Sequence, residues 1–256
     1  MGALHAGHEK LIQTARADSD VLAVSIFVNP IQFGPNEDYG RYPRDMAQDL
    51  EMCERNGVDV VFAPPVEEMY PSPQLTFVEV ARVSEHLCGK FRPGHFRGVA
   101  TVVLKLLNIV QPHRAYFGEK DMQQLAVIRR MVADLNVPVE IVGVPTVRES
   151  DGLALSSRNK YLNPEERAAA PALYRALKDA AARIRAGEND ASRIREAAFA
   201  ALEASALIRV EYFEVVDPDE LQPVARIDGP VRIASAVWLG KTRLIDNVYG
   251  ASTPLG

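Results

Sequence analysis

Short apolar runs rich in β-branched residues alternate with amphipathic helical segments through the first part of this sequence. The clearest run spans residues 21–28 and ends at Asn29-Pro30, which is typical of a buried strand entering a loop. The same rhythm predicts further elements at 44–55 (helix), 58–63 (strand), 76–80 (extended), 99–109 (helix), 115–117 (strand), 122–135 (helix) and 139–144 (strand). Strands that alternate with helices form a parallel sheet covered on both faces, with ligands at the carboxyl ends of the strands.

A different rhythm follows after about Arg148. Two Ala-rich helices are predicted at 164–186 and 190–205, and the strands predicted after them lie at 210–216, 231–239 and 242–245. Helices followed by strands favour a smaller α+β unit with an antiparallel sheet. The sequence therefore predicts an α/β fold with two domains: a Rossmann-like nucleotide-binding domain over residues 1–148 and a smaller α+β lid domain over 149–256.

Composition excludes several classes of protein. The 256 residues are 47% hydrophobic and carry a net charge of −5, so they can bury a core but offer no broad basic field for nucleic acid. The two cysteines, Cys53 and Cys88, lack CxxC spacing, and we expect both to be reduced and at least half buried. No apolar stretch is long enough to cross a membrane as a helix. We expect a cytoplasmic enzyme or binding protein.

The first signal of a site is His5-Ala-Gly-His8, which runs directly into a helical pattern. Two histidines three residues apart face the same way at a helix start, where backbone N–H groups and the helix dipole attract anions. Gly7 allows a ligand to approach the backbone closely. This chemistry suits a nucleotide phosphate. The alternatives are a surface turn with incidental histidines, or a zinc pair that lacks nearby ligands to complete a tetrahedral site.

Two later segments have side chains of similar chemistry. Gly118-Glu-Lys-Asp121 closes a strand and opens a helix, where Lys120 could neutralise phosphate and Asp121 could cap the helix or hold a base or metal. Leu155-Ser-Ser-Arg158 offers two hydroxyls and a planar cation for an anion. Taken alone, a charged strand-to-helix turn such as the first segment is most often solvated, and the second segment fits a serine helix cap with a surface arginine better than an anion site.

Two common nucleotide motifs are absent. Gly240-Lys-Thr242 resembles the end of a P-loop, but Ser235 stands where that motif requires glycine. No GxGxxG follows any predicted strand, which argues against a dinucleotide oxidoreductase.

Six segments in collinear order resemble the pantothenate synthetase family of the nucleotidylyltransferase superfamily. These segments are MGALHAGH at 1–8, FVNPIQF at 27–33, YPR at 42–44, RPGHFRGV at 92–99, GEKDMQQ at 118–124 and GLALSSRN at 152–159. His-x-Gly-His alone would be generic, whereas six such segments spread over the chain are specific to one family.

The resemblance implies an AMP-forming ligase that condenses (R)-pantoate with β-alanine at the expense of ATP. Pantoate first attacks the α-phosphate of ATP to give pantoyl-adenylate and pyrophosphate, and the amine of β-alanine then displaces AMP. The product is pantothenate, a precursor of coenzyme A. The resemblance also implies Mg²⁺, a homodimer and a mobile carboxyl-terminal domain.

The family pattern also implies roles for particular residues. His5 and His8 would stabilise charge at the α-phosphate, with His8 the proposed proton donor, and Lys120 and Arg158 would assist them. Gln32 would bind pantoate and β-alanine, Gln124 would bind pantoate, and Asp49 is the candidate for magnesium. The residues expected around ATP are Met1, Gly2, Ala3, Leu4, His5, Ala6, Gly7, His8, Gly118, Glu119, Lys120, Asp121, Val147, Leu155, Ser156, Ser157 and Arg158.

Two departures from the family pattern concern the first residues. Family members carry a strand and a Pro-Thr pair before the methionine that matches Met1, so the first strand of the sheet is expected to be missing here. Ala6 stands where a glutamate is common.

Two other functions stay open: a different nucleotidylyltransferase that stops after transferring AMP or CMP, and a nucleotide-sensing protein without turnover.

Overall fold

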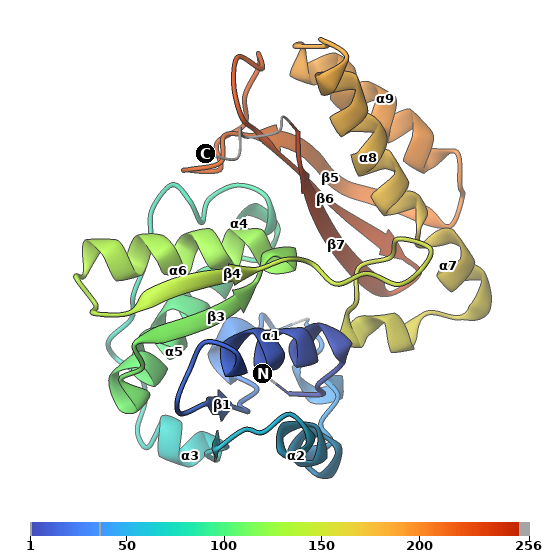
Figure 1. Cartoon of the computed structure of the whole chain (residues 1–256). Helices are drawn as coiled ribbons and strands as arrows, with labels where there is room; N and C mark the ends of the chain where they lie inside the picture. The colour runs from blue at the N-terminus through green and yellow to red at the C-terminus, as the bar shows by residue number, and fades with distance from the viewer. Residues whose placement is uncertain (1, 36, 251–256) are drawn as a thin grey trace. The chain divides into compact units, whose positions relative to one another are not determined.

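The computed structural model describes residues 2–35 and 37–250, which form two compact units (Figure 1). The first unit comprises Met1–Ala81, Phe91–Glu119 and Gln124–Val147. The second unit comprises Arg82–Lys90, Lys120–Gln123 and Arg148–Gly256. The chain thus enters the second unit twice, in two short segments, before it passes into it at Arg148.

Parallel strands build the first unit, as the sequence predicts. Strand β1 (Ala23–Ser25) pairs with β2 (Val60–Phe62), and β3 (Arg114–Gly118) pairs with β4 (Glu140–Val144). Strands β1, β2 and β4 are shorter than their predicted apolar runs, whereas β3 extends one residue beyond each end of its predicted run. The predicted extended segment at 76–80 joins no strand ladder within residues 2–35 and 37–250.

Helices alternate with these strands along the chain. They are α1 (Ala6–Arg16), η1 (Pro30–Gln32), η2 (Tyr39–Arg41), α2 (Met46–Arg55), α3 (Val66–Met69), α4 (Cys88–Phe91), α5 (His95–Val110), η3 (Glu119–Asp121) and α6 (Met122–Asp134). Asn56 is the C-cap of α2, and Gly57 follows in the left-handed conformation that this residue pair predicts, with φ +69°. Ile12 and Ala15 of α1 pack with Val24 of β1 in a buried cluster, which fixes α1 against the strand.

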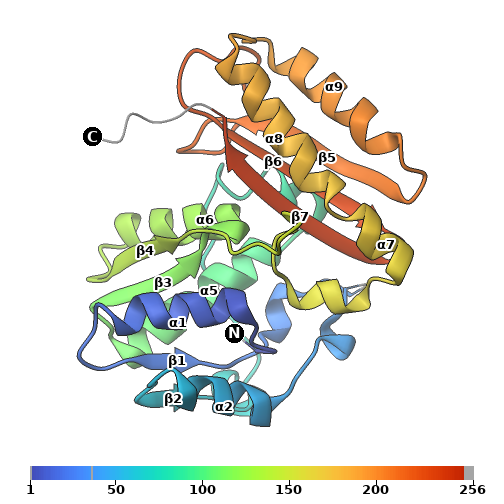
Figure 2. The same cartoon turned by 45° about the vertical axis from the view of Figure 1, so that its right-hand side comes forward.

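An antiparallel sheet and three helices build most of the second unit. The sheet has the order β5 (Ile208–Val216), β6 (Arg232–Leu239) and β7 (Thr242–Tyr249), and both pairings are antiparallel as predicted. Helices α8 (Ala172–Arg185) and α9 (Ala191–Glu203) cover one face of this sheet (Figure 2). A single apolar cluster fills the space between them, with Leu177, Ile194 and Phe213 fully buried.

The helix predicted over 164–186 is wrong in one respect, because two helices replace it. Helix α7 (Pro164–Ala169) stops before Pro171, and Pro171 becomes the N-cap of α8. Proline has no N–H to donate to the preceding turn, and its ring clashes with the carbonyl four residues earlier. The short helix η4 (Ser157–Tyr161) precedes α7.

Candidate active site

Two histidines cap the amino terminus of α1 reciprocally. His5 is the N-cap, and its Nδ1 accepts a hydrogen bond from the amide of Gly7 at 3.1 Å. The Nδ1 of His8 accepts from the amide of His5 at 3.3 Å, and the two ring centroids are 4.1 Å apart. A ring nitrogen that accepts a hydrogen bond from an amide carries no proton, so each neutral imidazole carries its proton on Nε2. The caps therefore select the tautomer with an Nε2–H donor.

The loop before α1 is held by a buried carboxylate. Asp49 of α2 is 1% exposed, and its two oxygens accept the amides of Ala3 at 2.9 Å and Leu4 at 2.6 Å. Ala3 has φ +50°, a left-handed conformation that a residue with a side chain adopts at a cost. The two hydrogen bonds to Asp49 offset that cost and fix the backbone one residue before His5. Met1, also predicted to contact ATP, lies outside the described residues.

A magnesium site built by the protein alone does not fit these residues. Both oxygens of Asp49 already accept backbone amides. Over residues 2–35 and 37–250, no group of three His, Cys, Asp or Glu side chains could hold a metal ion. The role of Asp49 toward magnesium stays a prediction.

Gln32 lies in η1 within a buried hydrogen-bond chain. The Nδ2 of Asn29 donates to the Oε1 of Gln32 at 3.2 Å and to the carbonyl of Gly98 at 3.1 Å. The hydroxyl of Tyr70 donates to the Oδ1 of Asn29 at 2.8 Å. Neither Asn29 nor Tyr70 was predicted from the residue pattern as a site residue. The signal for Asn29 is its position, because it directly follows the apolar run at 21–28, and ligands collect at the carboxyl ends of parallel strands.

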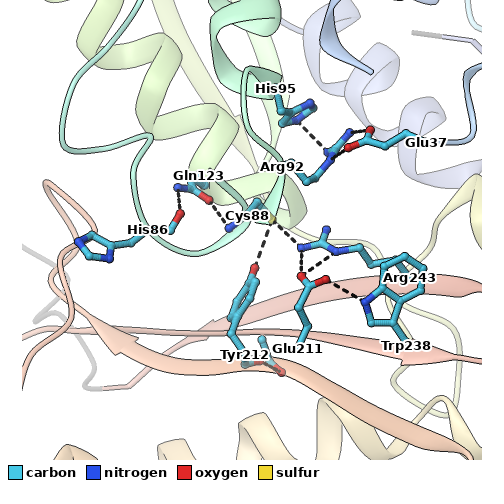
Figure 3. A network of polar contacts seen from close by, with 11 residues as sticks. Glu37, His86, Cys88, Arg92, His95, Gln123, Glu211, Tyr212, Trp238 and Arg243 are labelled. Carbon is cyan, nitrogen blue, oxygen red and sulfur yellow. Dashed lines mark hydrogen bonds and ion pairs between the residues drawn. The ribbon is translucent and has the colours of Figure 1, made fainter. Parts of the chain in front are cut away.

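Polar side chains of the segment 92–99 lie next to Gln32. The ring Nδ1 of His95 is 2.9 Å from the carbonyl oxygen of Gln32, and its Nε2 is 3.0 Å from the guanidinium of Arg92. Figure 3 shows Arg92 between His95 and the carboxylate of Glu37, to which its Nε donates at 2.9 Å. This ion pair keeps a positive charge beside His95.

The segment predicted to contact ATP phosphates after β3 falls partly in each unit. Gly118 ends β3 and Glu119 begins η3, both in the first unit, whereas Lys120 belongs to the second unit. There the carbonyl of Lys120 accepts from the Nδ2 of Asn247 in β7 at 3.1 Å. The ammonium of Lys120 is 3.8 Å from Asp121, a weak ion pair that leaves charge for an anion. Gln124, in the first turn of α6, is partly buried.

The segment Leu155–Arg158 leads into η4, whose first residue is Ser157. Ser156 is the N-cap of η4, and its hydroxyl accepts from the amide of Arg158 at 3.3 Å, which is the cap that the sequence left as an alternative. Ser157 is 6% exposed, whereas Leu155 and Arg158 are partly buried. Ser156 can serve as cap and phosphate donor together, since its hydroxyl hydrogen is not used in the cap.

A buried polar network in the second unit was not predicted from the sequence. Figure 3 shows the thiol of Cys88 between Tyr212 and Arg243, with Sγ 3.2 Å from the hydroxyl and 3.5 Å from the guanidinium. Gln123 accepts from the amide of Cys88 at 2.9 Å. Arg243 pairs with Glu211, which itself accepts from Trp238 at 2.8 Å. Cys53 and Cys88 are both free and buried, as expected.

The predicted residues thus lie in both units. The first unit holds Gly2, Ala3, Leu4, His5, Ala6, Gly7, His8, Gln32, Asp49, Gly118, Glu119, Gln124 and Val147, and the second holds Lys120, Asp121, Leu155, Ser156, Ser157 and Arg158. Within the described part of the chain, no helix is both long and apolar enough to cross a membrane.

The parallel strands and the paired histidines at the start of α1 are an arrangement that suits a nucleotide-binding enzyme. The sequence profile described as Pantoate-beta-alanine ligase matches residues 1–249. The chain belongs to the pantoate-beta-alanine ligase family.

Known proteins agree with this assignment. The chain is 58% identical to the pantothenate synthetase of Thermotoga neapolitana over 96% of its own length and 88% of the relative's. It is 58% identical to that of Moorella thermoacetica over 97% of its length and 88% of the relative's. Among solved structures, pantothenate synthetase from Thermus thermophilus superposes with TM-score 0.93 at 51% identity, covering 97% of this chain and 90% of that one.

A second solved structure has bound ligands. The pantoate-beta-alanine ligase of Francisella tularensis, complexed with beta-gamma ATP and beta-alanine, superposes with TM-score 0.80 at 37% identity. The similarity covers 99% of this chain and 88% of that chain.

Proposed function

We propose that this chain condenses (R)-pantoate with β-alanine to pantothenate, using ATP and releasing AMP and pyrophosphate. The observation that carries the proposal is the start of α1, where the caps give both His5 and His8 an Nε2–H donor at the positive end of the helix dipole. Membership of the pantoate-beta-alanine ligase family supports the two carbon substrates. The ligands of the Francisella protein support ATP and β-alanine.

The reaction has two displacement steps. A carboxylate oxygen of pantoate attacks the α-phosphorus of ATP, and the bond to the β-phosphate oxygen breaks to release pyrophosphate. The neutral amine of β-alanine then attacks the acyl carbon of pantoyl-adenylate. The acyl–oxygen bond breaks, AMP leaves, and the amine nitrogen loses a proton. Negative charge grows on the α-phosphate in the first step, where Nε2–H donors stabilise it most.

The remaining residues would bind and orient the substrates. Lys120, Ser156, Ser157 and Arg158 supply a cation, hydroxyls and a planar guanidinium for the phosphates of ATP. The helix dipole of α1 adds a partial positive charge. Gln32 and Gln124 offer amide groups for pantoate, with Gln32 also near β-alanine. Val147, Gly118, Glu119, Asp121 and the Met1–Leu4 loop would contact the nucleotide.

Magnesium would arrive with ATP, because Mg²⁺ usually binds substrate phosphates with few protein ligands. It would neutralise phosphate charge there.

We also propose that the protein acts in the cytoplasm as a homodimer. Sedimentation of the purified chain tests the dimer.

A labelling experiment tests the reaction. Pantoate labelled with heavy oxygen in its carboxylate is incubated with ATP, magnesium and β-alanine, and we expect one labelled oxygen in the phosphate of AMP. Labelled pyrophosphate should also exchange into ATP with pantoate alone. Unlabelled AMP, or exchange that requires β-alanine, would contradict the adenylate. AMP release that ignores the amine would indicate a different nucleotidylyltransferase, and ATP binding without pyrophosphate release would indicate a sensor.

A further inference from the structure

A backbone carbonyl fixes the orientation of the Asn29 amide. The Nδ2 of Asn29 lies 3.1 Å from the carbonyl oxygen of Gly98, which can only accept a hydrogen bond. The nitrogen of the amide must therefore lie on that side, and the Oδ1 must lie on the other. Asn29 is 2% exposed, so water cannot replace a lost partner easily.

The hydroxyl of Tyr70 satisfies the oxygen side of the same amide. It donates to the Oδ1 of Asn29 at 2.8 Å. Burial raises the pKa of Tyr70 to about 12, so the hydroxyl keeps its proton near neutral pH. The ring is held in place by Phe27, at 6.2 Å between ring centroids, and by the ammonium of Lys105, at 4.6 Å from the ring centroid.

The second hydrogen of Asn29 Nδ2 orients Gln32. It donates to the Oε1 of Gln32 at 3.2 Å, so the oxygen of that amide faces Asn29 and its Nε2 faces away. The main chain of Gln32 is fixed as well, because its carbonyl lies 2.9 Å from the ring Nδ1 of His95. The hydrogen bonds thus run in one direction from Tyr70 through Asn29 to Gln32.

We propose that Tyr70 is a positioning residue for substrate binding: by donating to Asn29, its hydroxyl holds Gln32 so that the Gln32 NH₂ group is presented to an acceptor of the substrate. The acceptors on pantoate are its carboxylate and hydroxyl oxygens. The inference rests on the proposed function of Gln32. Without the hydroxyl, the Oδ1 of Asn29 is buried without its donor, and the amide keeps only the Gly98 carbonyl of the two contacts that favour its orientation.

Steady-state kinetics of Tyr70→Phe test this inference. We expect the KM for pantoate to rise about tenfold, because that factor corresponds to the free energy of one buried hydrogen bond. The KM for ATP should change by less than about twofold. Tyr116→Phe is the matched control, because the Tyr116 hydroxyl donates to Asp18 at 3.0 Å outside this chain of hydrogen bonds. Equal effects of the two variants on the KM for pantoate would overturn the inference.

A double-mutant cycle separates positioning from general destabilisation. If Tyr70 acts through Gln32, Tyr70→Phe should add almost nothing to the pantoate KM of Gln32→Ala. Additive effects would overturn the inference, and so would a Gln32→Ala variant with unchanged pantoate KM. A wild-type chain that forms no pantothenate would instead overturn the proposed function.

If Tyr70→Phe does not fold, the wild-type chain still provides a test. Side-chain amide hydrogens of Asn29 should exchange with solvent far more slowly than those of Asn108, which is exposed on α5. The NH₂ resonances of Gln32 should shift when pantoate is added. Exchange of Asn29 as fast as that of Asn108, or no shift for Gln32 at saturating pantoate, would overturn the inference.

Discussion

The side chain of His8 caps the backbone amide of His5, the N-cap residue of the helix that contains His8. The amide of His5 donates to the Nδ1 of His8 at 3.3 Å, while the His5 ring accepts from the helix in return. Serine with glutamate or glutamine usually builds such a capping box. Here two imidazoles build it, so the same contacts that start the helix also determine which nitrogen of each ring carries the proton.

His8→Ala should slow adenylate formation by about a hundred- to a thousandfold and weaken ATP binding only modestly, because the lost donor acts mainly on charge in the transition state. His8→Gln should recover part of the rate. Its amide can accept from His5 as a capping box does and can still donate a hydrogen bond. Rapid-quench single turnovers and ATP titration measure the two quantities. Loss of ATP binding with a normal rate for the bound fraction would contradict the catalytic assignment.

Asp49→Asn should lower the free energy of unfolding by about 2 kcal/mol and slow adenylation, because an amide offers one acceptor where two backbone amides need one each. Asp59→Asn is the matched control, since Asp59 accepts the amide of Leu22 at 2.7 Å away from the histidines. Urea unfolding and single-turnover rates compare them. The magnesium concentration for half-maximal rate should stay unchanged in Asp49→Asn, and a large increase would support Asp49 as a metal ligand instead.

Gly98→Ala should weaken pantoate binding and destabilise the fold. A Cβ at Gly98 would lie 2.4 Å from the carbonyl oxygen of Ile31 and 2.7 Å from the Cα of Gln32, so the backbone of η1 must move. We expect a loss of about 1–3 kcal/mol in the free energy of unfolding. Gly229→Ala is the control, because nothing lies within 4 Å of its added Cβ. Calorimetry with and without pantoate measures both effects, and equal behaviour of the two variants would contradict the close packing.

Asp151→Asn should destabilise the chain at neutral pH but not in acid. The Arg167 guanidinium, and after it the Leu153 amide, holds the pKa of Asp151 below its usual value. A carboxyl with a lowered pKa stabilises the fold above its unfolded pKa, and that contribution is lost as the pH falls through the folded pKa. The pair is partly exposed, so we expect less than about 1 kcal/mol at neutral pH, disappearing below about pH 4. Urea unfolding across pH, with exposed Asp179→Asn as control, measures it. A deficit independent of pH would contradict the ion pair.

Local patterns in the sequence were enough to predict most strands, most helices and the His5–His8 helix start. Each of these features depends on residues a few positions apart, such as the histidines and Gly7, so a short stretch of sequence is enough to predict it. The break at Pro171 was missed because the apolar period continues across it. It could have been found, since proline cannot continue a helix at that point.

Contacts between distant residues were beyond such patterns. Tyr70 reaches Asn29 across 41 positions, and Asp49 reaches Ala3 across 46. A lone tyrosine or aspartate gives no local sign of such a partner. Family resemblance supplied Asp49 as a metal candidate, whereas its hydrogen bonds to the Ala3 and Leu4 amides emerged only from the three-dimensional structure.

The second unit cannot be cut out of the gene as one piece. Gln123, which lies in one of its two short early segments, donates to the carbonyls of Val83 at 2.9 Å and His86 at 2.7 Å in the other. The Nδ2 of Asn247 in β7 donates a hydrogen bond to the carbonyl of Lys120. A fragment starting at Arg148 would lack Lys120, and the Nδ2 of Asn247 would lose this hydrogen bond. A transplant of this unit into another protein therefore has to include all three stretches of chain. Recombination at a single crossover would separate them.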